Sequence, residues 1–173
     1  MPRAPLTISR PELLIDGSDM QYRRMIDALF AFSARHEAVR AGHAALIGLT
    51  GIEYTFLISI QHLQDASDVS VKLLADHLHL SGAFCTTMVG KLIKKGLVRK
   101  HIDSTDRRKV CLEVTDEGRK LLAGLAPTQR QVNDVQFGCL SRQDFLMLCG
   151  LLEKLIKSAD QALALQAYLS NSK

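Results

Sequence analysis

The sequence predicts a mainly α-helical fold with one small two-stranded β-hairpin. Two observations support this prediction. Helix N-cap residues and apolar residues at helical spacing recur along most of the 173 residues. The apolar period changes to two only once, after Gly96. Because 47% of the residues are hydrophobic, the chain has enough apolar side chains to bury a core of ordinary size.

The N-terminal third is expected to hold two helices. Residues 1–18 contain three of the four prolines, so this segment is expected to be irregular. A first helix is predicted over residues 19–45, with an apolar side. Thr50 then offers an N-cap and Glu53, three residues later, completes a capping box. The helix that follows is apolar on most sides, which predicts that it is buried.

Two short helices joined by a tight turn are predicted next. Ser70 can cap a helix over VKLLADHLHL, and Ser81 can cap a second over GAFCTTMVGKLIKKG, which Gly96 ends. Each has an apolar stripe at helical spacing, and in the second the stripe contains Cys85, Val89 or Met88, and Leu92. Helices of this length separated by LHLS are typical of a helix-turn-helix.

The segments LVRKHID and RKVCLEV are predicted to be the two strands, with STDR as their turn. The residues expected to face inward are Val98, Val110, Leu112 and Val114. Thr115 is expected to cap a long helix over residues 116–137, and Ser141 a last helix with Asp144 at the capping-box position. The last helix has an apolar stripe with little of the domain left to bury it: Phe145, Leu148, Leu152, Leu155, Ala159 and Leu163. Such a stripe usually packs against a partner, and a symmetric dimer is the commonest outcome.

The positive charge is concentrated in residues 70–110. This segment has nine cations and three anions, a balance of +6, so the rest of the chain carries −2 of the net +4. A basic patch attracts polyanions such as DNA. The alternative is a solvated basic face with no partner.

The second helix of the pair and the hairpin tip carry residues suited to duplex DNA. Short hydroxyl side chains near a helix N-terminus reach base edges, and lysines neutralise phosphates. The candidate residues on the helix are Ser81, Thr86, Thr87, Lys91 and Lys94. At the hairpin tip, Arg107 and Arg108 resemble the arginines of a wing, which enter a narrow minor groove. The alternatives are a polar outer face on the helix and a surface pair between Asp106 and an arginine.

Three stretches identify a resemblance to a known family. LT-x3-Y-x2-L at 49–57, KKGLV at 94–98 and DSTDRRKVCLEVTDEG at 103–118 resemble the MarR family of bacterial winged helix-turn-helix transcriptional regulators. The resemblance covers residues 20–165 and is most specific in the wing. It implies a homodimer that binds a pseudo-palindromic operator, with its recognition helix in the major groove. It also implies a repressor that a small, often aromatic or phenolic, effector releases from DNA.

The resemblance and the element order together predict four segments: an irregular extension (1–18), a first helix for dimerisation and effector binding (19–48), a winged helix-turn-helix domain (49–115) and C-terminal dimerisation helices (116–173). The sequence departs from the family in the recognition helix. Thr87 and Gly90 stand where relatives often carry arginine and aspartate. Phe84 stands where a small polar residue is common, and its ring is expected either to touch a thymine methyl group or to fold back onto the core.

An anionic aromatic effector, an acid or its thioester, would suit four residues of the first two helices. They are His36, Arg40, His43 and Tyr54. An arginine binds a carboxylate through two hydrogen bonds, and a tyrosine offers a hydroxyl. The alternative is that His36 and Arg40 face solvent and Tyr54 belongs to the core.

Other classes of protein fit less well. The sequence has no Walker-type loop, nucleophile elbow or H-E-x-x-H, so we expect no enzyme and no cofactor. The histidines lack metal-ligand spacing, so no metal site is expected. The four cysteines are expected to be buried free thiols, and the absence of a signal peptide or membrane span predicts a soluble cytoplasmic protein. The alternatives are a helical protein-interaction module without specific DNA readout and a redox- or metal-responsive regulator of the same fold.

Overall fold

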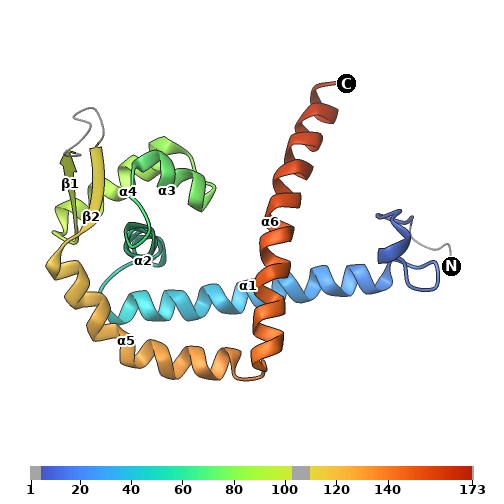
Figure 1. Cartoon of the computed structure of the whole chain (residues 1–173), viewed down its shortest axis with the longest axis horizontal. Coiled ribbons are helices and arrows are strands. Elements are labelled where there is room, and N and C mark those ends of the chain that lie inside the picture. The colour runs from blue at the N-terminus through green and yellow to red at the C-terminus, as the bar shows by residue number, and fades with distance from the viewer. Residues whose placement is uncertain (1–4, 103–109, 173) are drawn as a thin grey trace. The chain divides into compact units, whose positions relative to one another are not determined.

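The structure is a computed structural model that describes residues 5–102 and 110–172. Its helices and strands lie where the sequence predicts them (Figure 1): α1 (Met20–Leu46), α2 (Gly51–Gln64), α3 (Val71–Leu78), α4 (Gly82–Lys94), β1 (Val98–Ile102), β2 (Val110–Val114), α5 (Asp116–Phe137) and α6 (Arg142–Asn171). A short 3-10 turn (Pro11–Leu13), which the sequence did not predict, precedes them. The chain divides into two compact units, Met1–Pro127 and Thr128–Lys173.

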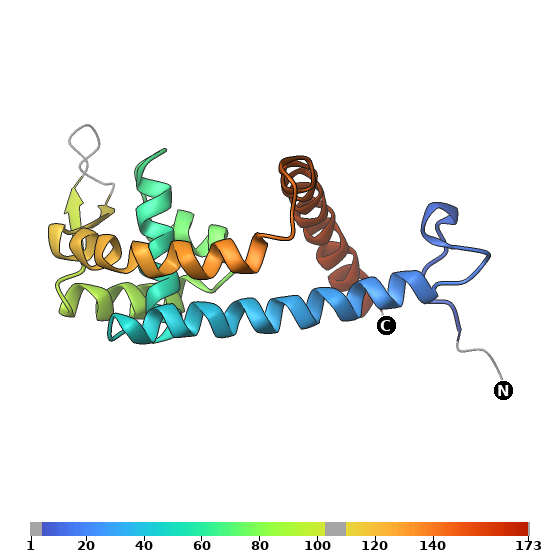
Figure 2. The ribbon, with the colours of Figure 1, turned by 90° about the horizontal axis from the view of Figure 1, so that it is seen from below.

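The first unit is built around one hydrophobic core. Helices α2, α3 and α4 and the hairpin gather at the C-terminal end of α1, while the rest of α1 extends away from this lobe (Figures 1 and 2). Only His43 and Ala44 of α1 are buried. In α2, by contrast, Phe56, Leu57 and Ile60 are fully buried, which confirms the prediction that this helix is buried.

The helix-turn-helix is confirmed, with both serine caps in place. The Leu73 amide donates a hydrogen bond to Ser70 Oγ (3.1 Å), and the Phe84 amide donates to Ser81 Oγ (3.3 Å). The turn between the two helices depends on His79, which adopts φ = 52°. This left-handed conformation is uncommon for a residue other than glycine, and it lets the Leu80 amide reach the Ala75 carbonyl at 3.0 Å.

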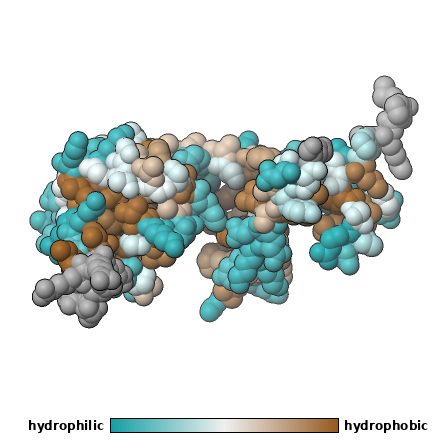
Figure 3. Space-filling model, turned by 90° about the horizontal axis from the view of Figure 1, so that it is seen from above, coloured by the Kyte–Doolittle hydropathy of each residue, from teal (hydrophilic) through white to brown (hydrophobic). Residues whose placement is uncertain are grey.

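The hairpin is antiparallel, and Val98 pairs with Val114 at its base. The Leu112 amide donates to the Val69 carbonyl (2.7 Å), which ties the hairpin to the segment before α3. The expectation that Val110 faces inward is wrong. Val110 is 47% exposed, because it lies at the end of the hairpin that is farther from the hydrophobic core. Exposed apolar side chains of this kind appear as brown surface on the lobe (Figure 3).

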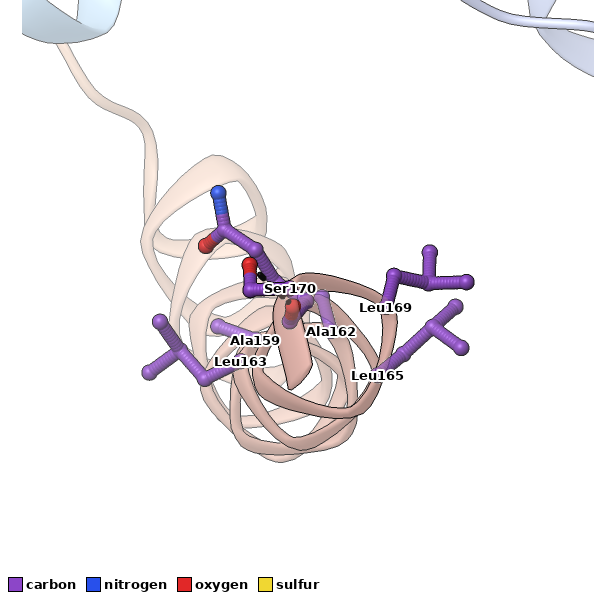
Figure 4. Close-up of a pocket in the computed structure, with 7 residues that line it drawn as sticks. Ala159, Ala162, Leu163, Leu165, Leu169 and Ser170 are labelled. Carbon is purple, nitrogen blue, oxygen red and sulfur yellow. Dashed lines mark hydrogen bonds between the residues drawn. The ribbon is translucent and has the colours of Figure 1, made fainter. Parts of the chain in front are cut away.

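The second unit is dominated by α6. Its predicted capping box is present: the Asp144 amide donates to Ser141 Oγ (3.2 Å) and the Ser141 amide donates to the Asp144 carboxylate (3.0 Å). No residue of Arg142–Asn171, all of which the structure describes, is buried. Figure 4 shows the side chains of its C-terminal half, among them Leu163 and Leu165, pointing outward on different sides of the helix. The apolar stripe is therefore exposed within this chain.

The expectation for the cysteines is half correct. Cys85 and Cys111 are buried free thiols, but Cys139 is exposed and Cys149 is half-buried. The two exceptions lie at the start of α6 and in the turn before it, where no core surrounds them. Among the described residues no single helix is both long and apolar enough to span a bilayer, and α1 and α2 pass that test only as a pair bent by 88°.

Candidate nucleic-acid interface

Helix α4 has one buried and one exposed side, as its sequence predicts. Its buried residues are Cys85, Met88, Val89 and Leu92. The five residues of this helix and its N-cap that are predicted to contact DNA are all exposed: Ser81, Thr86, Thr87, Lys91 and Lys94. The structure thus brings the hydroxyl groups to the N-terminal half of α4 and the lysines to its C-terminal half, on the side away from the core.

The two threonine hydroxyls already have acceptors within the helix. Thr86 Oγ1 donates to the Gly82 carbonyl (2.8 Å), and Thr87 Oγ1 donates to the Ala83 carbonyl (3.1 Å). A hydroxyl whose proton is engaged still has lone pairs that accept hydrogen bonds. In this conformation the threonines therefore offer acceptors and methyl groups, which suit adenine and cytosine amino groups and the thymine methyl group.

The lysines and arginines of the basic segment divide into two groups. Lys95 is paired with Glu53, and Arg99 with Glu113 across the hairpin. Within the described part of the chain, four lysines are exposed and make no salt bridge: Lys72, Lys91, Lys94 and Lys100. The lysines without a salt bridge are therefore the ones whose charge is available to phosphates.

The Glu53–Lys95 pair links the start of α2 to the end of α4. Lys95 Nζ lies 2.9 Å from Glu53 Oε1, and the Glu53 side chain is only 7% exposed. The Thr50 amide donates to the same carboxylate at 2.9 Å and completes the capping box. The Thr50 backbone hydrogen bond, more than Lys95, holds the pKa of Glu53 below its usual value, although burial opposes the shift. Sequence reasoning found the capping box but missed Lys95, since a partner 42 residues away leaves no local signal.

The wing is anchored at its base by charged groups. Arg99 Nη2 lies 2.7 Å from Glu113 Oε2, and Arg119 Nη1 lies 3.7 Å from Glu113 Oε1. Thr115 Oγ1 donates to the Gly96 carbonyl (2.6 Å), which joins the start of α5 to the end of α4. The predicted wing-tip contacts, Arg107 and Arg108, lie outside the described residues.

Three of the four predicted effector residues lie together. Arg40 Nη2 donates to Thr55 Oγ1 (2.9 Å), and its guanidinium lies over the Tyr54 ring, 5.2 Å from the centroid. The His43 ring meets the same tyrosine edge-on at 6.4 Å. Burial raises the pKa of Tyr54, while Arg40 opposes the shift. His36 lies one turn earlier, stacked on Phe32 with 5.8 Å between centroids.

The His43 ring is buried, and one of its two nitrogens lacks a hydrogen-bond partner among the described residues. His43 is 4% exposed, and its Nε2 has no hydrogen-bond partner among the described residues. A buried polar atom left in this state costs free energy. A ligand or water that reached Nε2 would therefore be bound favourably.

The redox and metal alternatives gain no support from the described residues. Burial raises the pKa of the Cys85 thiol, so the reactive thiolate is disfavoured there. No group of three or more histidine, cysteine, aspartate or glutamate residues in the described ranges is arranged to hold a metal ion.

A helix-turn-helix followed by a β-hairpin wing, with a basic exposed side on the second helix, defines a winged-helix DNA-binding protein. Residues 47–109 match the model of the MarR family. The chain is 30% identical to the HTH-type transcriptional repressor NicR of Pseudomonas putida over 128 residues, 74% of this chain and 79% of that one. The chain belongs to the MarR family of transcriptional regulators, which are not enzymes.

Two solved structures of the same fold extend the comparison. A MarR variant from E. coli complexed with operator DNA has a TM-score of 0.63 and 18% identity, covering 80% of this chain and 99% of that one. BpsR of Bordetella bronchiseptica, whose DNA binding is regulated by 6-hydroxynicotinic acid, has a TM-score of 0.59 and 23% identity, covering 75% and 90%.

Proposed function

We propose that this chain represses transcription in the cytoplasm by binding a pseudo-palindromic operator as a homodimer. Helix α4 enters the major groove, and Arg107 and Arg108 of the wing enter the adjacent minor groove. The observation that carries this proposal is the exposed side of α4. Its lysines, Lys91 and Lys94, have no salt-bridge partner among the described residues, and they follow hydroxyl side chains placed at the helix N-terminus. In a DNA complex the lysines would neutralise phosphates, and the hydroxyl groups would reach base edges.

The homodimer would cover the apolar stripe of α6. Phe145, Leu152 and Leu163 are 51%, 43% and 62% exposed, and a stripe of this length is costly to leave in water. Two copies related by a two-fold axis would place two α4 helices one helical turn of DNA apart. The operator would then contain half-sites centred about 10 base pairs apart.

Titration of operator affinity against salt tests the DNA-binding proposal. Each neutralised phosphate should contribute a slope of about −0.9 in a plot of log affinity against log salt. We expect Arg107→Ala to weaken binding by about fivefold or more, since a contact of this kind contributes about 1–3 kcal/mol. Arg130→Ala, an exposed arginine on α5, serves as the matched control and should bind as the wild type does.

Fluorescence anisotropy with a labelled duplex measures the salt dependence of binding and the affinity of each variant. Binding of duplex DNA that does not depend on salt would contradict the proposed interface. Equal affinities of wild type and Arg107→Ala, both folded, would remove the wing arginine from it. A footprint confined to one asymmetric half-site would contradict the dimer.

The effector proposed for this regulator is a small aromatic acid or its thioester, bound at Arg40, His43 and Tyr54 with His36 nearby. The guanidinium of Arg40 would exchange its bond to Thr55 for the carboxylate. His43 Nε2, which has no hydrogen-bond partner among the described residues, would gain a polar contact. The regulation of BpsR by 6-hydroxynicotinic acid supports this chemistry, since that compound is an aromatic acid with a second polar group.

We expect 6-hydroxynicotinic acid to raise the melting temperature of the protein and to lower its affinity for operator DNA. A ligand at 100 times its Kd stabilises the native state by about 2.7 kcal/mol. Arg40→Ala should abolish the shift, while Arg35→Ala, whose guanidinium donates to the Ala31 carbonyl on the same helix, should retain it. The absence of a shift with this acid, with other aromatic acids and with their thioesters would reject the aromatic effector.

A further inference from the structure

Phe84 is an apolar ring on the exposed side of α4, among polar residues. It lies in the first turn, since its amide donates to the capping oxygen of Ser81, and it is 42% exposed. Thr87 and Lys91 follow at one and two helical turns on the same side. The first turn of such a helix is the part that contacts base edges when the helix lies in the major groove.

The ring is held in place by the core below it. It packs edge-on against Phe56, with 6.2 Å between the ring centroids and 71° between their planes, and Phe56 itself is fully buried. Edge-to-face packing of this kind is favourable and restricts the ring. Part of the ring is therefore fixed on the core while the rest faces solvent, so a partner that binds the exposed part orders little that is not already ordered.

We propose that Phe84 reads thymine in the operator by contacting its 5-methyl group in the major groove. This inference rests on the proposed function, in which α4 enters that groove. The phenyl ring has no hydrogen-bond donor or acceptor. The thymine methyl is the one apolar group that the base edges present in the major groove, so an exposed phenyl ring there distinguishes thymine from the other three bases.

The contact predicts one position in each half-site where the methyl group itself is recognised. Replacing each thymine of the operator in turn by uracil keeps the Watson–Crick pair and removes only the methyl group. At the position facing Phe84, wild-type affinity should fall by about fourfold per half-site, the factor expected for one buried methyl group. Fluorescence anisotropy at fixed salt measures each substituted duplex.

Phe84→Ala should bind the unsubstituted operator more weakly and lose the uracil penalty at that position alone. Phe84→Leu keeps apolar packing on Phe56 with a shorter side chain, so it should retain a smaller penalty and remain folded. Thr87→Ala, the matched control on the same side of α4, should keep the full penalty at the Phe84 position. Circular dichroism melting confirms that each variant is folded.

Two outcomes would overturn the inference. The first is a wild type whose affinity is unaffected by uracil at every thymine of a specifically bound operator. The second is a penalty that persists unchanged in Phe84→Ala and Phe84→Leu. Both leave the proposed function in place, because they require specific binding. If the protein shows no salt-dependent binding of duplex DNA, the proposed function itself is rejected.

Discussion

Replacing Gly118 with alanine is expected to lower the free energy of unfolding by about 1–3 kcal/mol, the usual cost of overpacking. A Cβ on Gly118 would lie 2.5 Å from the Leu97 carbonyl oxygen and 2.7 Å from Val114 Cγ1. The same carbonyl accepts the Thr115 amide at 3.0 Å. Because one of the two clashing atoms belongs to the backbone, the start of α5 and the segment entering the wing would have to move.

Gly124→Ala is the matched control on the same helix. A Cβ there meets no atom within 4 Å, so the substitution should stabilise the protein by up to about 1 kcal/mol through helix propensity alone. Urea unfolding of the three proteins at one concentration, followed by circular dichroism, measures both effects. A Gly118→Ala variant as stable as the wild type would show that the carbonyl is free to move.

Glu53→Ala is expected to destabilise the protein by about 2 kcal/mol, since it removes the capping box and the pair with Lys95 together. Glu53→Gln preserves a capping box and should recover about half of the loss. Lys95→Met should cost about 1 kcal/mol, because the lysine end of the pair is 40% exposed and screened by solvent. Lys94→Met, the adjacent exposed lysine, should leave stability unchanged.

The contribution of Glu53 should also depend on pH. Its pKa is lower in the folded protein than the ordinary value of 4.5. The folded state therefore binds this proton less readily than the unfolded chain does, and the carboxylate contributes its full stability above about pH 4.5. That contribution is lost as the pH falls through the lower, folded pKa. The difference in unfolding free energy between wild type and Glu53→Gln should thus shrink from pH 7 to pH 3. A constant difference over that range would contradict the role of the charge.

The predicted elements that proved correct depend on local sequence signals. A cap needs a serine or threonine and an amide two or three residues later, so the caps at Thr50, Ser70, Ser81 and Ser141 could be predicted from the chain alone. The same holds for the buried stripe of α4, since helical spacing fixes which side chains share a face.

The expectations that failed concern positions at the edges of the fold. Val110 has strand spacing, yet it lies at the open end of the hairpin. Cys139 and Cys149 have apolar neighbours in sequence, yet no core forms around them. Burial depends on what lies opposite a residue in space, and alternation or composition carries no information about that.

The sequence by itself determined the helix order, the helix-turn-helix, the hairpin and the family, because each depends on residues within about one element of one another. Only the tertiary structure decided which charges of the basic segment remain available. Lys94 and Lys95 are neighbours and both are exposed, but Lys94 makes no salt bridge among the described residues, whereas Lys95 reaches a buried carboxylate at the start of α2. It also decided how Phe84 is placed. Its ring packs against Phe56 while 42% of the residue stays exposed. Both outcomes depend on contacts between elements distant in the chain, and packing of the core around α2 brings those elements together.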